Sequence, residues 1–290
     1  MSSQPAAGQT GMTTLAVPGA SLRYEVHGEG PLLALVGHPM GIDDLRGLAR
    51  ALAGSRTVLL HDPRGFGGSP LVDPSDDADP AVLADDLAAL VREAGGGPVE
   101  VVGTSGGAVT ALAFAQRHHD LVAAVVAHEP PLVGVLPDEA ELRARTDEVV
   151  RILHEQGPGP AFGAFMALAG FDGPPAPDDE PDEQPDEGQP PSEEEMAAGY
   201  RMLAHGLVPI CTWEPDDTAL RAVDGRLVLA GGADSAPTQL ARRAPEALAS
   251  RLGAVFVELP GDHAPFVERM GGDPAPFAAA VRDVLDRAQR

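Results

Sequence analysis

The sequence predicts an α/β protein in which strands end at one edge of a sheet and polar loops follow them. An apolar, β-branched run over 99–102 leads into a Gly-x-Ser-x-Gly turn and then into a helical pattern. Two later apolar runs, over 226–230 and 254–259, end in loops that carry Asp234 and His263, respectively. Because these side chains follow strand ends in the order Ser, Asp, His, we expect them to meet at one edge of the sheet.

The Gly-x-Ser-x-Gly turn around Ser105 is the most informative of these segments. A strand before the turn and a helix after it form the arrangement that exposes a nucleophilic serine. Gly103 and Gly107 lack the side chains that would clash where strand and helix crowd together. The motif alone is weak, because the chain contains 34 glycines. Its position between a strand and a helix favours a nucleophile over an incidental serine.

These motifs resemble those of the α/β-hydrolase fold superfamily, and most of all the small serine hydrolases of bacteria that use no cofactor. Residues 31–39 match the family's third strand and oxyanion loop, and residues 61–69 are similar to its Asp-x-Arg-Gly-x-Gly-x-Ser segment. The resemblance covers nearly the whole chain. It implies a mostly parallel central sheet flanked by helices, an inserted helical cap, and no cofactor. The chain departs from the family in one respect, because Val36-Gly37 stands where the family often has His-Gly, and His38 follows.

The expected roles follow from the chemistry of acyl transfer. A serine hydroxyl needs a base, and His263 is expected to take its proton while Asp234 orients the imidazole. The resemblance implies that the backbone N–H of Gly106 is one donor to the oxyanion. The second donor is expected from the loop after the third strand, and His38 is the candidate because Pro39 has no N–H.

A second carboxylate is an alternative orienting acid. Glu129 follows an apolar run over 122–127, and some α/β-hydrolases take their acid from that position. We favour Asp234 because its position matches the commoner arrangement. Asp262 lies directly beside His263 and is interpreted as a turn former.

Several reaction classes are excluded by residues that the chain lacks. All 20 basic residues are Arg, so a Schiff-base lysine and a P-loop lysine are impossible. The single cysteine, Cys211, excludes an internal disulfide and a Cys-rich zinc site, and no metal is expected. Serine at the nucleophile position argues against the haloalkane dehalogenases and epoxide hydrolases, which share the fold implied above. A formal charge of −24 opposes binding to nucleic acid or to an anionic membrane.

The chain is expected to form a core from residues 1–136 and 213–290, with a helical cap over 137–212. Within the cap, residues 171–195 contain eleven acidic residues, many prolines and no basic residue. This composition predicts a flexible loop. Apolar side chains near the site are candidates for a substrate pocket: Met40, Phe162, Phe165, Met166, Met202 and Trp213.

The sequence therefore predicts a serine hydrolase that cleaves a carboxylic ester, lactone or thioester of a small apolar molecule through an acyl-enzyme. The same triad can also support perhydrolysis, lyase chemistry, carbon–carbon bond hydrolysis or a biosynthetic cyclisation. A ligand receptor that hardly turns over is a further alternative. The chain begins without a signal-peptide pattern and has no run of about 18 apolar residues, so we expect a cytoplasmic enzyme. Its expected partner is a small-molecule substrate, and the oligomeric state stays open.

Overall fold

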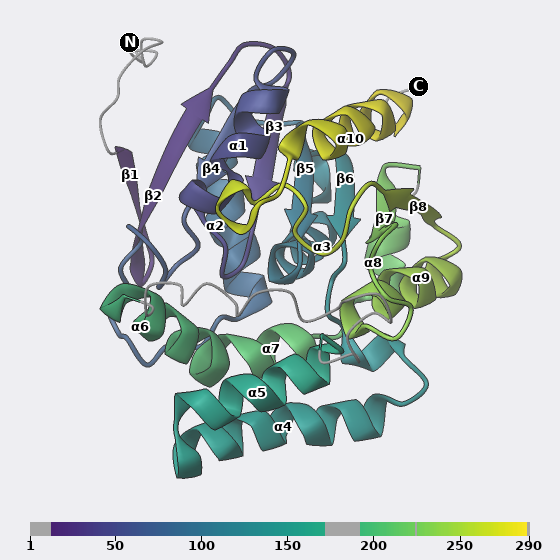
Figure 1. Cartoon of the computed structure of the whole chain (residues 1–290). Helices are drawn as coiled ribbons and strands as arrows, with labels where there is room; N and C mark the ends of the chain where they lie inside the picture. The colour runs from purple at the N-terminus through teal and green to yellow at the C-terminus, as the bar shows by residue number, and fades with distance from the viewer. Residues whose placement is uncertain (1–12, 172–191, 224, 289–290) are drawn as a thin grey trace.

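The computed structural model describes residues 13–171, 192–223 and 225–288. These residues contain one eight-stranded sheet with the order β1-β2-β4-β3-β5-β6-β7-β8 (Figure 1). The pairs β1–β2 and β2–β4 are antiparallel, and every other neighbouring pair is parallel. The mostly parallel sheet of the prediction is therefore confirmed. The strands are β1 (Thr13–Val17), β2 (Ala20–His27), β3 (Leu32–Val36), β4 (Thr57–His61), β5 (Val99–Thr104), β6 (Val122–His128), β7 (Leu227–Gly232) and β8 (Val255–Leu259).

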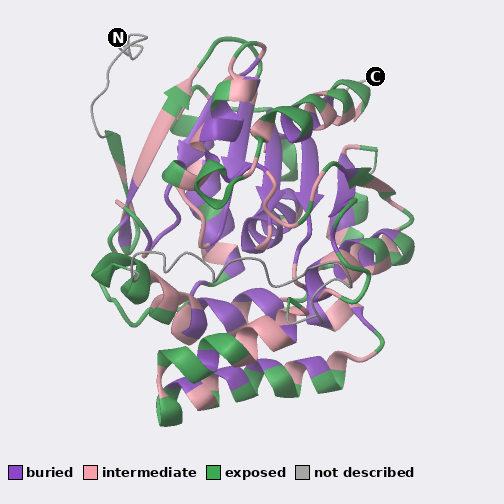
Figure 2. Ribbon diagram, viewed as in Figure 1, coloured by how far each residue is buried: buried purple, intermediate pink, exposed green. Residues whose placement is uncertain are grey.

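Helices cover both faces of the sheet because successive side chains of each central strand point to opposite faces. In β3, Leu33 and Leu35 pack into a cluster with α1 (Ile42–Leu52) and α10 (Pro274–Ala288). Ala34 and Val36 pack into the cluster on the other face. The sheet between these layers is buried along its central strands (Figure 2). The second face is covered by α2 (Pro80–Glu93), α3 (Gly106–Arg117), α8 (Asp217–Arg221) and α9 (Leu240–Leu252).

Further helices form a separate layer beside the sheet (Figure 1). This layer has its own apolar cluster, which includes Leu142, Leu153, Ala161 and Leu207. It occupies the part of the chain predicted to be a cap, and the division into domains stays a prediction. Its elements are α4 (Glu139–Gln156), α5 (Pro158–Ala169), α6 (Glu193–Arg201), a π-helical turn (Met202–Gly206) and α7 (Leu207–Cys211).

The predicted acidic loop over 171–195 falls mostly on residues 172–191, which lie outside the described residues. The last residues of that range begin α6. The Ser192 hydroxyl accepts the Glu195 N–H at 3.2 Å, and the Glu195 carboxylate accepts the Ser192 N–H at 2.8 Å. This reciprocal pair is a capping box, so a helix starts inside the segment that the composition predicted to be a loop.

Short 3₁₀ turns connect several elements: His119–Leu121, Val133–Val135 and Glu268–Met270. The longest described helix is α4, with 18 residues. None of the helices in the described ranges combines the length and the apolar character that a membrane crossing requires.

Candidate active site

Ser105 lies at a strained turn between β5 and α3. Its φ of 54° and ψ of −128° place a non-glycine residue in a region that costs about 1–3 kcal/mol. In the described part of the chain, Glu129, with φ 53°, is the other non-glycine residue with positive φ. The Ser105 N–H donates to the carbonyl of His128 at 2.9 Å, which ties the turn to the end of β6. Both strained residues therefore belong to one small region at the edge of the sheet.

The two glycines of the turn remove clashes between strand and helix, as predicted. A Cβ on Gly107 would overlap the carbonyl group of Val36, and a Cβ on Gly103 would overlap the carbonyl oxygen of Gly107. Since these contacts are with backbone atoms, no side-chain rearrangement can relieve them. The close crossing of β5 and α3 thus requires glycine at position 103, and the close approach of α3 to the end of β3 requires glycine at position 107.

His263 is paired with Glu129. Its Nδ1 lies 2.6 Å from Oε2 of the fully buried Glu129 carboxylate. The other oxygen, Oε1, accepts the N–H of Gly232 at 2.8 Å. Asp234, which the sequence favoured as the orienting acid, is exposed, and the His263 ring is not bonded to it. The expected partner of the ring is therefore corrected from Asp234 to the alternative, Glu129.

The local path of the chain explains this correction. Gly232, at the end of β7, turns its N–H to Glu129. The chain then bends so that the Asp234 N–H donates to the carbonyl of Gly261 at 3.0 Å. This contact joins the loops after β7 and β8 and leaves Asp234 on the solvent side. Asp262 accepts the N–H of Ala264 at 3.0 Å, so its interpretation as a turn former is confirmed.

The Glu129 carboxylate is held in its charged form. Burial alone would raise its pKa, but the hydrogen bond from His263, the charges of His128 and His263 and the N–H of Gly232 lower the pKa to about 2. A carboxylate at neutral pH keeps the Nδ1 proton of His263 in place, so Nε2 is the ring nitrogen left for chemistry.

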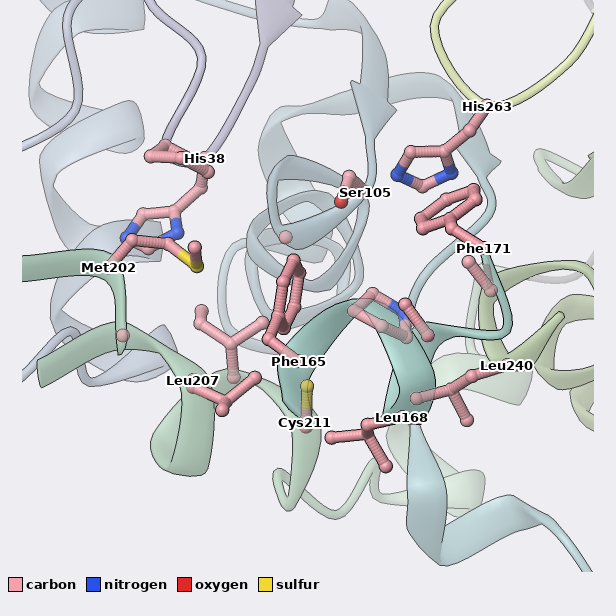
Figure 3. A pocket seen from close by; sticks show the side chains of 17 residues that line it. His38, Ser105, Phe165, Leu168, Phe171, Met202, Leu207, Cys211, Leu240 and His263 are labelled. Atoms are coloured by element: carbon pink, nitrogen blue, oxygen red, sulfur yellow. The ribbon is translucent and has the colours of Figure 1, made fainter. Parts of the chain in front are cut away.

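Ser105 and His263 line the same cavity, which Figure 3 shows from close by. In the described residues the Ser105 hydroxyl makes no hydrogen bond to the ring. Catalytic hydrogen bonds are often long in unliganded enzymes and shorten when substrate binds.

The loop after β3 lies directly against the Ser105 turn. A Cβ on Gly106 would lie 2.8 Å from the carbonyl oxygen of His38 and 3.1 Å from its ring Nδ1. The two predicted oxyanion residues are therefore neighbours. His38 is only 3 % exposed, and burial, with a further contribution from the charge of Arg201, lowers its pKa to about 4. The ring is uncharged at neutral pH.

The cavity measures about 90 Å³, and most of its wall comes from the helical layer and the start of α9. Of the predicted pocket residues, Phe165 and Met202 line it. Met40 instead packs beside the α1–α10 cluster, and Trp213 packs on the opposite side of the sheet. Phe162 is 50 % exposed, and Met166 does not reach the wall.

Sequence reasoning missed several wall residues. Leu168 follows Phe165 by one helical turn, so the i, i+3 spacing on α5 was a usable signal. The other positions depend on how the helices pack. Burial raises the pKa of the Cys211 thiol to about 12, so this wall residue stays protonated. The missed apolar lining residues include Leu168, Phe171, Leu207, Ile210, Cys211 and Leu240.

Possible metal ligands are not grouped at this site. Among residues 13–171, 192–223 and 225–288, no three His, Cys, Asp or Glu side chains are placed as a metal site would require.

Comparisons with known proteins agree with this architecture. A family model described as alpha/beta hydrolase fold matches residues 30–159. An uncharacterized hydrolase of Bacillus subtilis (strain 168), YraK, is 36% identical over 124 residues. That match covers 42% of this chain and 46% of YraK, so it spans less than half of the relative's length.

Solved structures match nearly the whole chain. A thermophilic esterase from Thermogutta terrifontis, with malate bound, superposes with a TM-score of 0.67 at 22% identity over 96% of this chain and 98% of that one. An enol-lactonase from Burkholderia xenovorans LB400 gives a TM-score of 0.61 at 19% identity over 94% and 100% of the two chains. At these identities the likeness establishes the fold. The chain therefore has the α/β-hydrolase fold, and its residues 30–159 match the model of that family.

Proposed function

We propose that the chain is a serine hydrolase that cleaves a carboxylic ester, lactone or thioester of a small apolar molecule through an acyl-enzyme. The observation that carries the proposal is the pairing of the buried Glu129 carboxylate with His263, on the cavity where Ser105 lies at its strained turn. Ser105 is the nucleophile, His263 is the general base and acid, and Glu129 takes the orienting role that the sequence assigned to Asp234.

The first half of the reaction forms the acyl-enzyme. Ser105 Oγ bonds to the carbonyl carbon while its proton moves to His263 Nε2, and the carbonyl electron pair moves onto oxygen. The N–H groups of Gly106 and His38 stabilise this oxyanion. The bond from carbon to the leaving oxygen or sulfur then breaks, and His263 gives its proton to the leaving group. Glu129 remains a carboxylate throughout and stabilises the imidazolium.

The second half repeats these steps with water. Water attacks the serine ester as His263 takes one of its protons. The tetrahedral intermediate then releases the carboxylic acid, and the proton returns to Ser105 Oγ. The enzyme is restored without any cofactor.

The lining of the cavity supports an uncharged, apolar substrate. No Asp, Glu or Arg side chain is among the described residues that form its wall. The formal charge of −24 on the chain also disfavours anionic substrates. The esterase and the enol-lactonase with the same fold act on bonds of the proposed class, which adds support by analogy.

The test compares Ser105→Ala with the wild type on p-nitrophenyl acetate, butyrate and hexanoate, and with a fluorophosphonate probe. Ser75→Ala, which changes an exposed serine in a loop, is the matched control. We expect Ser105→Ala to lower kcat by about 10⁴-fold or more and to abolish labelling, because losing the nucleophile alone removes nearly all triad catalysis. Ser75→Ala should keep kcat within about twofold of the wild-type value, since substitutions at exposed positions usually change the stability of the fold very little.

The same experiment separates the alternatives. Equal hydrolysis by Ser105→Ala and wild type would exclude the serine mechanism. Saturable binding of these esters without turnover or labelling would favour a receptor. Labelling of Ser105 without release of acid from any ester, lactone or thioester would favour a lyase, a carbon–carbon hydrolase or a cyclase on the same triad.

A further inference from the structure

We propose that the imidazole of His38 supplies a third donor to the oxyanion hole, through its Nδ1–H. This inference rests on the proposed function and extends it. Three nitrogen- or oxygen-bearing side chains line the described cavity wall: Ser105, His263 and His38. The reaction given above uses the first two and leaves the His38 ring without a role.

The ring is in the right place for this task. Its Nδ1 would lie 3.1 Å from a Cβ placed on Gly106, the residue whose N–H is the first expected donor. Gly106 is also the first residue of α3, a helix of 12 residues whose N-terminus favours negative charge. In Figure 3, Ser105 lies between the ring of His38 and the ring of His263. His38 therefore occupies the side of Ser105 on which the oxyanion would form, away from the general base.

Burial determines which ring nitrogen carries the proton. The ring is 3 % exposed and, with its pKa lowered to about 4, carries one proton at neutral pH. Its Nε2 has no hydrogen-bond partner among the residues that the structure describes. A proton on Nε2 would be a buried donor without an acceptor, whereas an unused acceptor is tolerated more readily. We therefore assign the proton to Nδ1. A ring N–H of His38 bonds to the backbone of the same residue, and the oxyanion, which is the stronger acceptor because it is charged, would take over this hydrogen bond.

The ring is also held in one orientation. Its edge meets the face of Phe66, with ring centroids 5.1 Å apart and planes at 78°. On another side Gly206, in the π-helical turn, lies so close that a Cβ there would be 3.1 Å from His38 Cε1. The cap thus fixes a donor that belongs to the core. Because the ring is already held in place, only its hydrogen bond has to change acceptor when the charge develops.

The chemistry requires no proton transfer. Nδ1–H donates a hydrogen bond to the oxyanion, and the proton remains on the nitrogen. Neutral imidazole can act in this way because its N–H still polarises a carbonyl oxygen. Removing one oxyanion donor typically lowers kcat by about 10²–10³-fold. Since the bond is strongest in the transition state, KM should change little.

The experiment uses three replacements of His38 that all keep the backbone N–H. His38→Asn retains a side-chain N–H near the position of Nδ1, whereas His38→Leu and His38→Phe have apolar side chains without a donor. The measured quantities are kcat and KM for p-nitrophenyl butyrate, and the inhibition constant of an alkyl trifluoromethyl ketone, whose serine adduct carries the same oxyanion. Met40→Leu, two residues further along the same loop and outside the cavity wall, is the control for altered packing.

We expect His38→Leu and His38→Phe to lower kcat by about 100-fold or more and to keep KM within about threefold of the wild-type value. The inhibition constant of the ketone should rise by a factor similar to the loss in kcat. His38→Asn should recover at least about a tenth of wild-type kcat, as a retained donor requires. A kcat within threefold of wild type in either donorless variant that folds would overturn the inference. Equal losses in all three variants, with unchanged ketone affinity, would overturn it as well, because they would indicate a packing role.

The Ser105→Ala result separates this inference from the proposed function. If Ser105 is required and the donorless variants stay fully active, only the role of the His38 ring fails. If Ser105→Ala is as active as wild type, the serine mechanism fails and the third donor fails with it.

Discussion

The sheet edge and the helical layer contribute different things to one cavity. The groups that we propose to react follow strands of the sheet: His38 follows β3, Ser105 follows β5, Glu129 follows β6 and His263 lies in the loop after β8. The apolar wall comes mostly from α5, the π-helical turn and α7. In the proposed mechanism the chemistry thus depends on loops at the edge of the sheet, and the space for the substrate is bounded by helices that pack on one another. Changes at the sheet edge should alter the rate of reaction, and changes in the helices should alter the choice of substrate.

The largest effect is expected from replacing the carboxylate that orients His263. In Glu129→Gln, the amide no longer enforces the correct ring tautomer or stabilises the imidazolium, so kcat should fall by about 10³–10⁴-fold. Asp234→Asn, at the exposed position, should leave kcat within about twofold. The measurement is kcat for p-nitrophenyl butyrate at pH 7.5, with circular dichroism to verify folding. A large loss in Asp234→Asn with an active Glu129→Gln would return the orienting role to Asp234.

The sequence predicted the core side of this comparison well. A strand followed by Gly-x-Ser-x-Gly indicates the turn, because a side chain at position 103 would overlap the backbone of α3 and one at position 107 would overlap the end of β3. The sequence alone could not decide which of the two carboxylates pairs with His263. Asp234 and Glu129 both follow strands, and only the positive φ of Glu129 and the direction of the Gly232 N–H decide which one meets the ring.

The cavity wall formed by the helical layer was harder to predict for a different reason. Apolar periodicity identifies which helical residues are apolar, but it does not tell a wall residue from one that packs elsewhere. Phe165 lines the cavity, whereas Phe162, three residues earlier on the same helix, is half exposed. The rotation of α5 against α4 and α9 decides this, and it depends on contacts between segments far apart in the sequence.

These two phenylalanines give the next test of the comparison. Phe165→Ala enlarges the cavity. The ratio of kcat/KM for p-nitrophenyl hexanoate to kcat/KM for p-nitrophenyl acetate should therefore change by about tenfold, which is the effect of one or two methylene groups in an apolar pocket. Phe162→Ala removes the same side chain from outside the cavity and should leave the ratio within about twofold. The measurement is the full ester series for both variants. Equal shifts in the two variants would mean that the helical layer does not set substrate choice.

The smallest effect concerns stability and again compares the sheet region with the helical layer. Three core histidines, His38, His61 and His128, are buried, and burial lowers the pKa of each to about 4. A pKa below its unfolded value of about 6.5 contributes stability that is fully present above pH 6.5 and is lost as the pH falls toward 4. At pH 5.5, each group should therefore have lost about 1.4 kcal/mol relative to pH 7.5.

The test follows urea unfolding of wild type and His61→Asn at pH 7.5 and 5.5, both above the pI of about 4.5. His61→Asn removes one buried titrating group, so its unfolding free energy should fall by about 1.4 kcal/mol less than that of wild type between the two pH values. His154→Asn, at an exposed position of α4, should change with pH as wild type does. An identical pH dependence in all three proteins would mean that His61 is no harder to protonate in the folded core than in the unfolded chain. Acid would then lower stability through carboxylates such as Glu129, whose pKa of about 2 in the fold lies below its usual value.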